Sequence, residues 1–235
     1  YITNPFGGQF HLNQWSTTLF WWSGIPYRLM LPADLFTFVW LMGMMYTTKF
    51  LDGLDGLVSG VTIIGALTIA ALAFQPMIAQ SATALLAIIL AGSFLGFIPW
   101  NWHPAKLFLG EGGSLFAGFM IGVLGIISGS KIATTFLVVG IPILDTLWVI
   151  VRRIIWEHRS PFEGDRRHLH HRLLDLGFSH RSVVGMFYFL AAYFGVAALF
   201  LQSQGKLIAL LILSTVMIVL GAGLVYSYWR RRKLL

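Results

Sequence analysis

Long apolar stretches alternate with short polar segments along almost the whole chain. A helix that crosses a bilayer needs about 20 mainly apolar residues, and the sequence holds seven stretches near that length. They lie at 34–51, 57–75, 81–98, 114–129, 132–156, 183–201 and 206–228. The pattern predicts an all-α polytopic integral membrane protein with about seven transmembrane helices in this chain.

Residues 1–33 follow a different pattern. They combine the turn-forming segment NPFGG with a polar and apolar alternation in QFHLN, which predicts a short β-hairpin or interfacial segment. The aromatic side chains there suit the headgroup region of a bilayer; they are Trp15, Trp21, Trp22 and Tyr27. The expected organisation is therefore an outer-face hairpin at 1–33, a transmembrane bundle at 34–228 and a basic tail at 229–235.

The composition supports a membrane protein and excludes an ordinary soluble domain. Only 11% of the residues are charged and 57% are hydrophobic, whereas soluble domains average about 25% charged residues. There are no cysteines, so disulfides are excluded. The chain opens on YITNPFGGQF, without an initiator methionine or a signal peptide, and we expect it to be a fragment of a longer protein.

The basic residues are distributed unevenly between the two sets of loops that seven spans would create. Of the 16 Lys and Arg residues, thirteen fall in or beside one set and three in the other. The basic set comprises the loops 52–56, 99–113 and 157–182 and the tail 229–235. Because positively charged loops stay in the cytoplasm, this set is predicted to be cytoplasmic and the hairpin to face outward.

The motif KFLDGLDGL (49–57) contains two carboxylates, Asp52 and Asp55, which share one face of a helix or tight turn. Gly53 and Gly56 let the backbone or a ligand approach closely. Carboxylates in this setting suit a metal–phosphate site or a general base. The alternative is an ordinary cap and turn between two spans.

The motif NWHPAKLFLGEGGSLFAG (101–118) holds Asn101, Lys106 and Glu111 before an apolar helix. A glycine-rich entry into a helix presents free N–H groups that favour anions, and Glu111 could hold Mg²⁺ against a phosphate. The alternative is simple capping of the helix by Ser114.

One acidic residue, Asp145, lies inside an apolar stretch. Such a group faces a bundle interior or a water-filled cavity, where it pairs with an arginine, forms the floor of a site, or makes a buried structural hydrogen bond. Arg152 and Arg153 end the same stretch. They are either topological anchors or a clamp for phosphate.

The segment RRHLHHRL (166–173) gathers imidazole and guanidinium groups at high density, which suits a diphosphate ligand. Its basic residues are Arg166, Arg167, His168, His170, His171 and Arg172. A zinc site is one alternative, although the arginines would repel a cation. A basic loop that touches anionic lipid is another, but it would not explain the histidines.

Three segments, DGLDGL, PAKLFLGEGGSLFAG and SPFEGDRRHLHHRL, occur in this order and together resemble the polyprenyl-phosphate N-acetylhexosamine-1-phosphate transferase family. The undecaprenyl-phosphate N-acetylglucosamine-1-phosphate transferase branch is more similar than phospho-N-acetylmuramoyl-pentapeptide transferase. The resemblance implies a bundle of ten or eleven helices in the bacterial inner (plasma) membrane, of which this chain supplies the C-terminal part. A paired-aspartate motif would lie in the missing part, so we expect the fragment alone to be inactive.

The resemblance also implies a reaction at the cytoplasmic face. A sugar 1-phosphate would move from a UDP-sugar to undecaprenyl phosphate with release of UMP, as the first membrane step of cell-envelope polysaccharide synthesis. The implied cofactor is Mg²⁺, with Mn²⁺ as a substitute. The implied partners are the two substrates and the lipid bilayer. A homodimer is compatible with the resemblance, and no nucleic acid is expected as a partner.

Resemblance and residue chemistry together assign roles to particular residues. Asp52, Asp55 and His171 are the predicted catalytic residues, and Glu111 with Asp52 is predicted to bind the metal. The predicted substrate contacts are Lys49, Asn101, Lys106, Arg152, Arg153, Arg167, His168 and His170. Lys49 stands where the family usually has Asn, and Glu111 stands where it usually has Asp.

Two other functions compete with the transferase. A transporter would need several charged residues near the bilayer midplane or repeats with broken helices, whereas the sequence shows Asp145 and no repeat. A non-catalytic relative that binds a lipid phosphate is the second alternative, and the departures at Lys49 and Glu111 keep it open.

Overall fold

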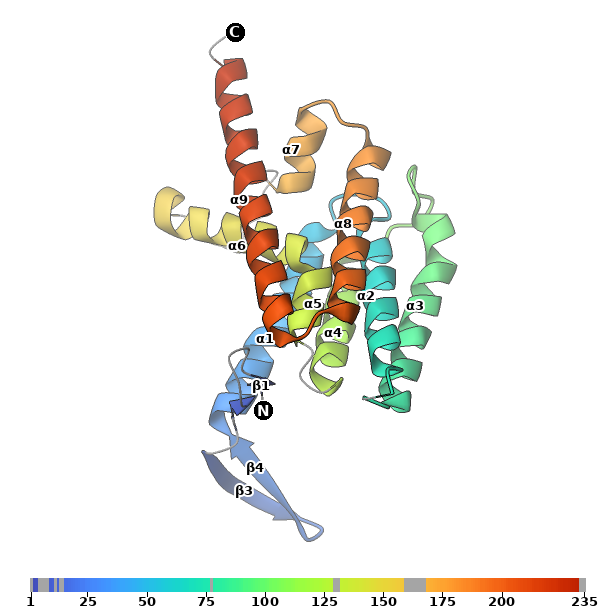
Figure 1. The fold of residues 1–235 in the computed structure, drawn as a ribbon, viewed down its shortest axis with the longest axis vertical. Helices are drawn as coiled ribbons and strands as arrows, with labels where there is room; N and C mark the ends of the chain where they lie inside the picture. The colour runs from blue at the N-terminus through green and yellow to red at the C-terminus, as the bar shows by residue number, and fades with distance from the viewer. Residues whose placement is uncertain are drawn as a thin grey trace.

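The computed structural model describes residues 2–3, 9–10, 12, 15–76, 78–128, 132–158 and 168–232. These residues form a helical bundle with a β-hairpin that projects from one end (Figure 1). The strands are β1 (Ile2–Thr3), β2 (Gln9–Phe10), β3 (Ser16–Trp22) and β4 (Ile25–Met30). The helices are α1 (Leu31–Leu51), α2 (Leu57–Ala73), α3 (Ser81–Asn101), α4 (Gly110–Ile127), α5 (Ile132–Val138), α6 (Gly140–Arg152), the π-helix η1 (Arg153–Glu157), α7 (Leu169–Asp175), α8 (His180–Phe200) and α9 (Ser203–Arg232).

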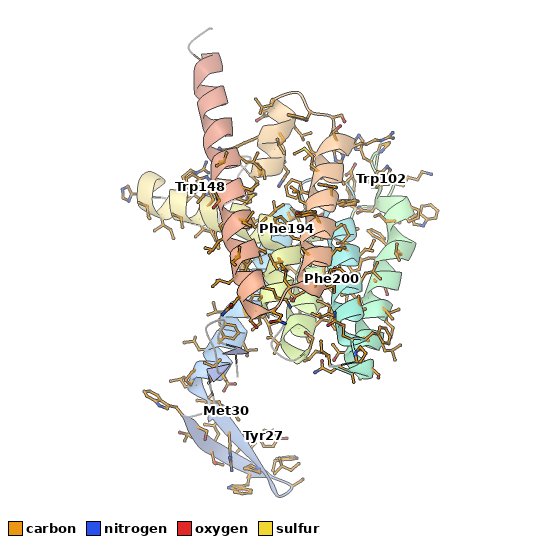
Figure 2. All side chains as sticks on the ribbon, in the orientation of Figure 1. Tyr27, Met30, Trp102, Trp148, Phe194 and Phe200 are labelled. Carbon is orange, nitrogen blue, oxygen red and sulfur yellow. The ribbon has the colours of Figure 1, made fainter. Side chains whose placement is uncertain are left out.

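A hairpin lies within residues 1–33, as predicted, but it forms from β3 and β4, which pair in antiparallel fashion. The segments NPFGG and QFHLN, on which the prediction rested, precede this hairpin in the sequence. Its turn residues Ser23 and Gly24 both have positive φ, at 49° and 79°, as the two central residues of a type I′ turn do. The rings of Phe20 and Tyr27 stack across the strands with centroids 4.8 Å apart. Figure 2 shows Tyr27 on the hairpin, well away from the helices.

Helix α2 lies at the centre of the bundle. Its sequence is apolar on every side, and 14 of its 17 residues are buried, which is typical of a core helix. It packs against α3, α4, α5 and α8. At Gly60 the absence of a side chain lets the ring of Tyr188, from α8, lie on the α2 backbone. The packing of α2 therefore fixes the position of the acidic loop that precedes it.

Helices α1 and α4 also approach each other closely, because glycine faces the contact. A Cβ added at Gly118 would meet the Thr48 side chain and the Met44 carbonyl. One turn further, the indole N–H of Trp40 donates to the carbonyl of Gly122 over 3.0 Å. Small residues allow such close helix contacts in membrane proteins. The contact aligns the last turn of α1 with the first turn of α4.

Four described helices are long and apolar enough to cross a membrane. They are α3, α4, α8 and residues Ser203–Gly221 of α9. The stretch 132–156, expected as one span, is two helices that meet at 82° and together would make a fifth. The break follows from Pro142, which has no N–H to donate to the carbonyl of Val138. The expected number of seven spans is not confirmed.

The loops after α1 and α3, helix α7 and the start of α8 lie at the end of the bundle opposite the hairpin (Figure 1). We call residues 49–56, 101–111 and 168–181 the polar end. Hydrogen bonds join its segments directly, as from Gly56 N–H to Asn101 and from Asp55 N–H to His180. The sequence-based sorting of loops predicted that these segments share one side.

Candidate functional site

The acidic loop 52–56 connects α1 to α2 at the polar end. The Asp52 N–H donates to the carbonyls of Thr48 and Lys49 over 3.1 and 3.3 Å, which ends α1. Gly56 has a φ of 78°, a conformation that glycine adopts without strain. The cap-and-turn interpretation is therefore correct for the backbone, and it leaves the two carboxylates to be explained.

The Asp52 side chain is half-buried. Burial raises the pKa of this carboxyl to about 6, and the neighbouring Asp55 carboxylate contributes. A group with such a pKa gains and loses a proton close to neutral pH, which is the property of a general base. A cation bound nearby would stabilise the ionised form.

Asp55 joins three segments of the polar end. Its Oδ2 lies 2.8 Å from Nδ1 of His103 and accepts a hydrogen bond from the Ala105 N–H over 3.1 Å. Its own N–H donates to Nε2 of His180 over 3.1 Å. Burial acts to raise the pKa of the Asp55 carboxyl, but the hydrogen bonds from His103 and Ala105 outweigh it and hold that pKa below its ordinary value. Asp55 is thus an ionised residue that ties the loops together.

Asp55, His103 and His180 also form a group that could hold a metal ion. One ligand atom from each lies within 4.8 Å of the others, and the two imidazole rings stack with their centroids 3.9 Å apart. Sequence reasoning assigned no role to either histidine. His103 lies inside the second motif, which was the available hint, whereas His180 is 125 residues from Asp55 and no pattern pairs them.

Asn101 is buried and connects the second motif to the acidic loop. Its Oδ1 accepts hydrogen bonds from the Gly56 N–H over 3.2 Å and from the Ser59 hydroxyl over 2.7 Å. Its Nδ2 donates to the Leu107 carbonyl over 3.0 Å. Both the oxygen and the nitrogen of the Asn101 amide therefore bind other groups of the protein. This favours a role for Asn101 in positioning the two loops.

Lys49 and Glu111 form an ion pair with Nζ and Oε1 2.5 Å apart. Glu111 lies in the first turn of α4, which begins at Gly110, earlier than the expected start of the span at 114. The capping role suggested for Ser114 is therefore wrong: Ser114 lies inside the helix, where its hydroxyl donates to the Glu111 carbonyl. The two positions at which the resemblance implies a departure from the family contact each other.

Asp145 binds the start of α7. Its Oδ2 lies 2.9 Å from Nδ1 of His168, and its Oδ1 accepts a hydrogen bond from the Leu169 N–H over 2.9 Å. The ring of His168 stacks on Phe50 with centroids 5.5 Å apart. Of the three interpretations of Asp145, the structure confirms the buried structural hydrogen bond.

His170 is fully buried beneath the acidic loop. A Cβ added at Gly53 would collide with its Nε2 and lie 3.0 Å from Nε2 of His171. Burial lowers the pKa of His170 to about 3, and the adjacent His171 and His168 add to the effect. His170 is therefore neutral at physiological pH. The half-buried His171, whose ring centroid is 4.3 Å from that of His170, is the better placed of the two to meet a ligand.

Three further predicted substrate contacts fall among the described residues. Lys106 is exposed, with its Nζ 5.8 Å from the centroid of the Trp100 ring. Its neighbour Trp102 marks the same loop in Figure 2. Arg153 is buried and Arg152 is half-buried at the end of α6. Arg167 lies outside the described residues.

The fold and the polar end define a class: a multi-pass α-helical membrane protein with titratable and charged groups gathered at one end of its bundle. Within that class, the chain belongs to glycosyl transferase family 4, whose sequence profile matches residues 4–129.

Several curated proteins are similar to the chain. It is 36% identical over 184 residues to a probable undecaprenyl-phosphate N-acetylglucosaminyl 1-phosphate transferase of Bacillus subtilis, which covers 75% of this chain and 50% of the relative. It is 36% identical over 177 residues to a decaprenyl-phosphate N-acetylglucosaminephosphotransferase of Mycolicibacterium smegmatis, covering 66% of the chain and 43% of the relative. A phospho-N-acetylmuramoyl-pentapeptide-transferase of Staphylococcus aureus is 27% identical over 193 residues, covering 82% and 59%.

These similarities confirm the resemblance seen in the motifs, including the lower similarity to the pentapeptide transferase branch. The chain spans about half the length of the curated relatives it matches.

Proposed function

We propose that the full-length protein transfers a sugar 1-phosphate, with N-acetylglucosamine 1-phosphate as the first candidate, from a UDP-sugar to undecaprenyl phosphate and releases UMP. The main support is the meeting of the three family motifs at the polar end. There the acidic loop contacts both the second motif and the histidine helix α7. The names of the similar proteins support the same reaction class.

The reaction joins two anions. An oxygen of the lipid phosphate forms a bond to the sugar-linked phosphorus, the bond from that phosphorus to the uridine-side phosphate breaks, and UMP leaves. Fixed positive charge and hydrogen-bond donors must stabilise the transition state. A site at the end of the helices suits this chemistry, because the polyprenyl tail stays in the bilayer. We favour a one-step displacement over a route through a carboxylate nucleophile.

We assign the ligand-facing roles to Asp52 and His171. Asp52 is half-buried, and its pKa of about 6 lets it accept a proton from the lipid phosphate. His171 would contact the diphosphate. We assign positioning roles to Asp55, Asn101, His168 and His170, because their contacts connect the loops to one another. We also propose that the substrates are contacted by four basic residues: Lys106, Arg152, Arg153 and Arg167.

We propose Mg²⁺, with Mn²⁺ as a substitute, as the metal ion held by Asp52 and Glu111. Mg²⁺ takes oxygen ligands, and the half-buried Asp52 carboxylate would gain from a nearby cation. When bound, the ion would neutralise charge on the diphosphate. The group of Asp55, His103 and His180 offers two imidazoles, which suit Zn²⁺ or Fe²⁺ better than Mg²⁺.

We further propose that the polar end faces the cytoplasm, where UDP-sugars are present. The support is the excess of Lys and Arg in the loops on that side. A homodimer stays a prediction.

The test is UMP release by purified full-length protein with Mg²⁺ and a UDP-N-acetylhexosamine, with and without undecaprenyl phosphate. We expect release only when the lipid phosphate is present, and loss of turnover in Asp52→Asn and His171→Ala with the unfolding temperature retained. Asp175→Asn is a matched control, because Asp175 is exposed on the same short helix as His171. Wild-type rates in both site variants would refute the assignment, and no UMP from any UDP-N-acetylhexosamine would refute the reaction.

One observation favours a non-catalytic relative as the second candidate. The Glu111 carboxylate, a proposed metal ligand, is paired with Lys49. A full-length protein that binds polyprenyl phosphate but releases no UMP would support this candidate.

A further inference from the structure

Lys49 and Glu111 meet because of how α1 and α4 pack. Lys49 lies in the last turn of α1 and Glu111 in the first turn of α4. The close contact of the two helices at Gly118 aligns these turns. The ion pair therefore follows from the fold and lies beside Asp52, whose N–H donates to the Lys49 carbonyl.

The ion pair is open to water. The Lys49 side chain is 37% exposed and the Glu111 side chain is 65% exposed. A pair this exposed contributes little to folding. It can therefore open without disturbing α1 or α4, and a cation from solution can reach the Glu111 carboxylate.

We propose that the Lys49 ammonium is an internal cation that competes with the divalent metal ion for the Glu111 carboxylate. This proposal rests on the proposed function, which assigns Glu111 to the metal. Divalent ions bind a carboxylate oxygen directly, so the ammonium and the ion cannot both hold Oε1 at close range. The ammonium also repels a divalent ion that binds within a few ångström.

Two consequences follow for the site. The metal binds more weakly than it would beside an uncharged residue at position 49, by roughly tenfold for one screened charge near the surface. Once the metal displaces Lys49 from Glu111, the ammonium is available to pair with an anionic ligand such as a diphosphate. Lys49 would thus leave the Glu111 carboxylate and pair with a phosphate of the substrate when the metal binds.

The experiment measures Mn²⁺ binding to the full-length protein, following the electron paramagnetic resonance signal of free Mn²⁺ without any substrate. We expect Lys49→Gln to bind Mn²⁺ roughly tenfold more tightly than wild type, and Lys49→Arg, which keeps the charge, to bind like wild type. Glu111→Gln should lose the site. Equal affinity in wild type and Lys49→Gln would overturn the proposal, and so would unchanged binding in Glu111→Gln.

Failure of this proposal is distinguishable from failure of the proposed function. UMP release by the wild-type protein tests the reaction, whereas the Mn²⁺ titration tests competition at Glu111 without turnover. A protein with normal UMP release and no effect of Lys49→Gln on Mn²⁺ affinity would refute the competition alone. A protein without UMP release and with tighter Mn²⁺ binding in Lys49→Gln would refute the reaction alone.

Discussion

The carboxylate of Asp145 and the imidazole of His168 lie 2.9 Å apart, and both side chains are buried. Asp145 belongs to α6, next to the 82° break after α5, whereas His168 begins the short helix α7. The pair therefore fastens the histidine helix to the bundle. These contacts explain why an acidic residue lies within an apolar stretch.

Removing either partner of this pair should loosen α7. We expect Asp145→Ala and His168→Ala each to lower the unfolding free energy by about 1–3 kcal/mol, because a buried polar group is left without its partner. The double variant should cost less than the sum of the two single variants. Thermal unfolding of the full-length protein in detergent measures this coupling, and strictly additive losses would contradict it.

Gly53→Ala should displace His170 and His171 without adding or removing a charged group. The new Cβ would collide with His170 Nε2 and crowd His171, so we expect a loss of UMP release of tenfold or more. Gly185→Ala is the matched control, since nothing lies within 4 Å of a Cβ added there, in the second turn of α8. That variant should keep its activity and gain slightly in stability. Wild-type turnover in Gly53→Ala would show that the histidine helix has room to move.

Asn101→Asp should disturb the second motif where it meets the acidic loop, while keeping the oxygen that accepts from Gly56 and Ser59. The change removes the donor to the Leu107 carbonyl and places a carboxylate against a carbonyl oxygen. We expect a loss of about 1–3 kcal/mol in stability and a clear drop in turnover. Ser59→Ala removes one hydrogen bond to the same amide and should cost less, about 0.5–1.5 kcal/mol. A larger loss in Ser59→Ala than in Asn101→Asp would contradict this role.

The burial of His170 predicts acid sensitivity of the fold. Its pKa is about 3 in the folded protein and about 6.5 when unfolded, so the unfolded chain binds the extra proton first as pH falls. Above pH 6.5, His170 is neutral in both states and does not lower the free energy of unfolding. As the pH falls from 6.5 toward 3, that free energy drops by up to about 1.4 kcal/mol per pH unit.

The measurement for His170 is the unfolding temperature between pH 7.5 and pH 5 in wild type and in His170→Gln. The variant should show a shallower dependence, because it cannot take up the proton. His158→Asn serves as the control at an exposed histidine and should leave the slope unchanged. Identical slopes in wild type and His170→Gln would rule out His170 as the source.

The sequence predicted a large part of the architecture because membrane segments follow simple rules of length and polarity. Apolar stretches marked most of the helices, and the alternation of loops placed the three motifs on one side. That placement does not depend on the exact span count, because it needs only that each intervening segment returns the chain to the same end. The break between α5 and α6 was missed, because apolar content hides a kink that Pro142 and its neighbours create.

The particular contacts of the site were less predictable. Asp52 and Asp55 stand close in sequence, and their spacing already indicated a shared site. The Asp55 N–H donates to His180, 125 residues away, and Glu111 meets Lys49 across 62 residues. Such pairings depend on how each helix is rotated about its axis.

The sequence by itself determined that this protein is a helical membrane bundle, that its polar motifs share one end, and which family it belongs to. Hydropathy and short motifs carry that information locally along the chain. Only the tertiary structure decided which carboxylate pairs with which nitrogen-bearing side chain: Asp145 with His168, Asp55 with His103, and Glu111 with Lys49. The reason is that glycine contacts such as Gly118 on Thr48 set the distance and rotation of neighbouring helices, and these determine which side chains meet.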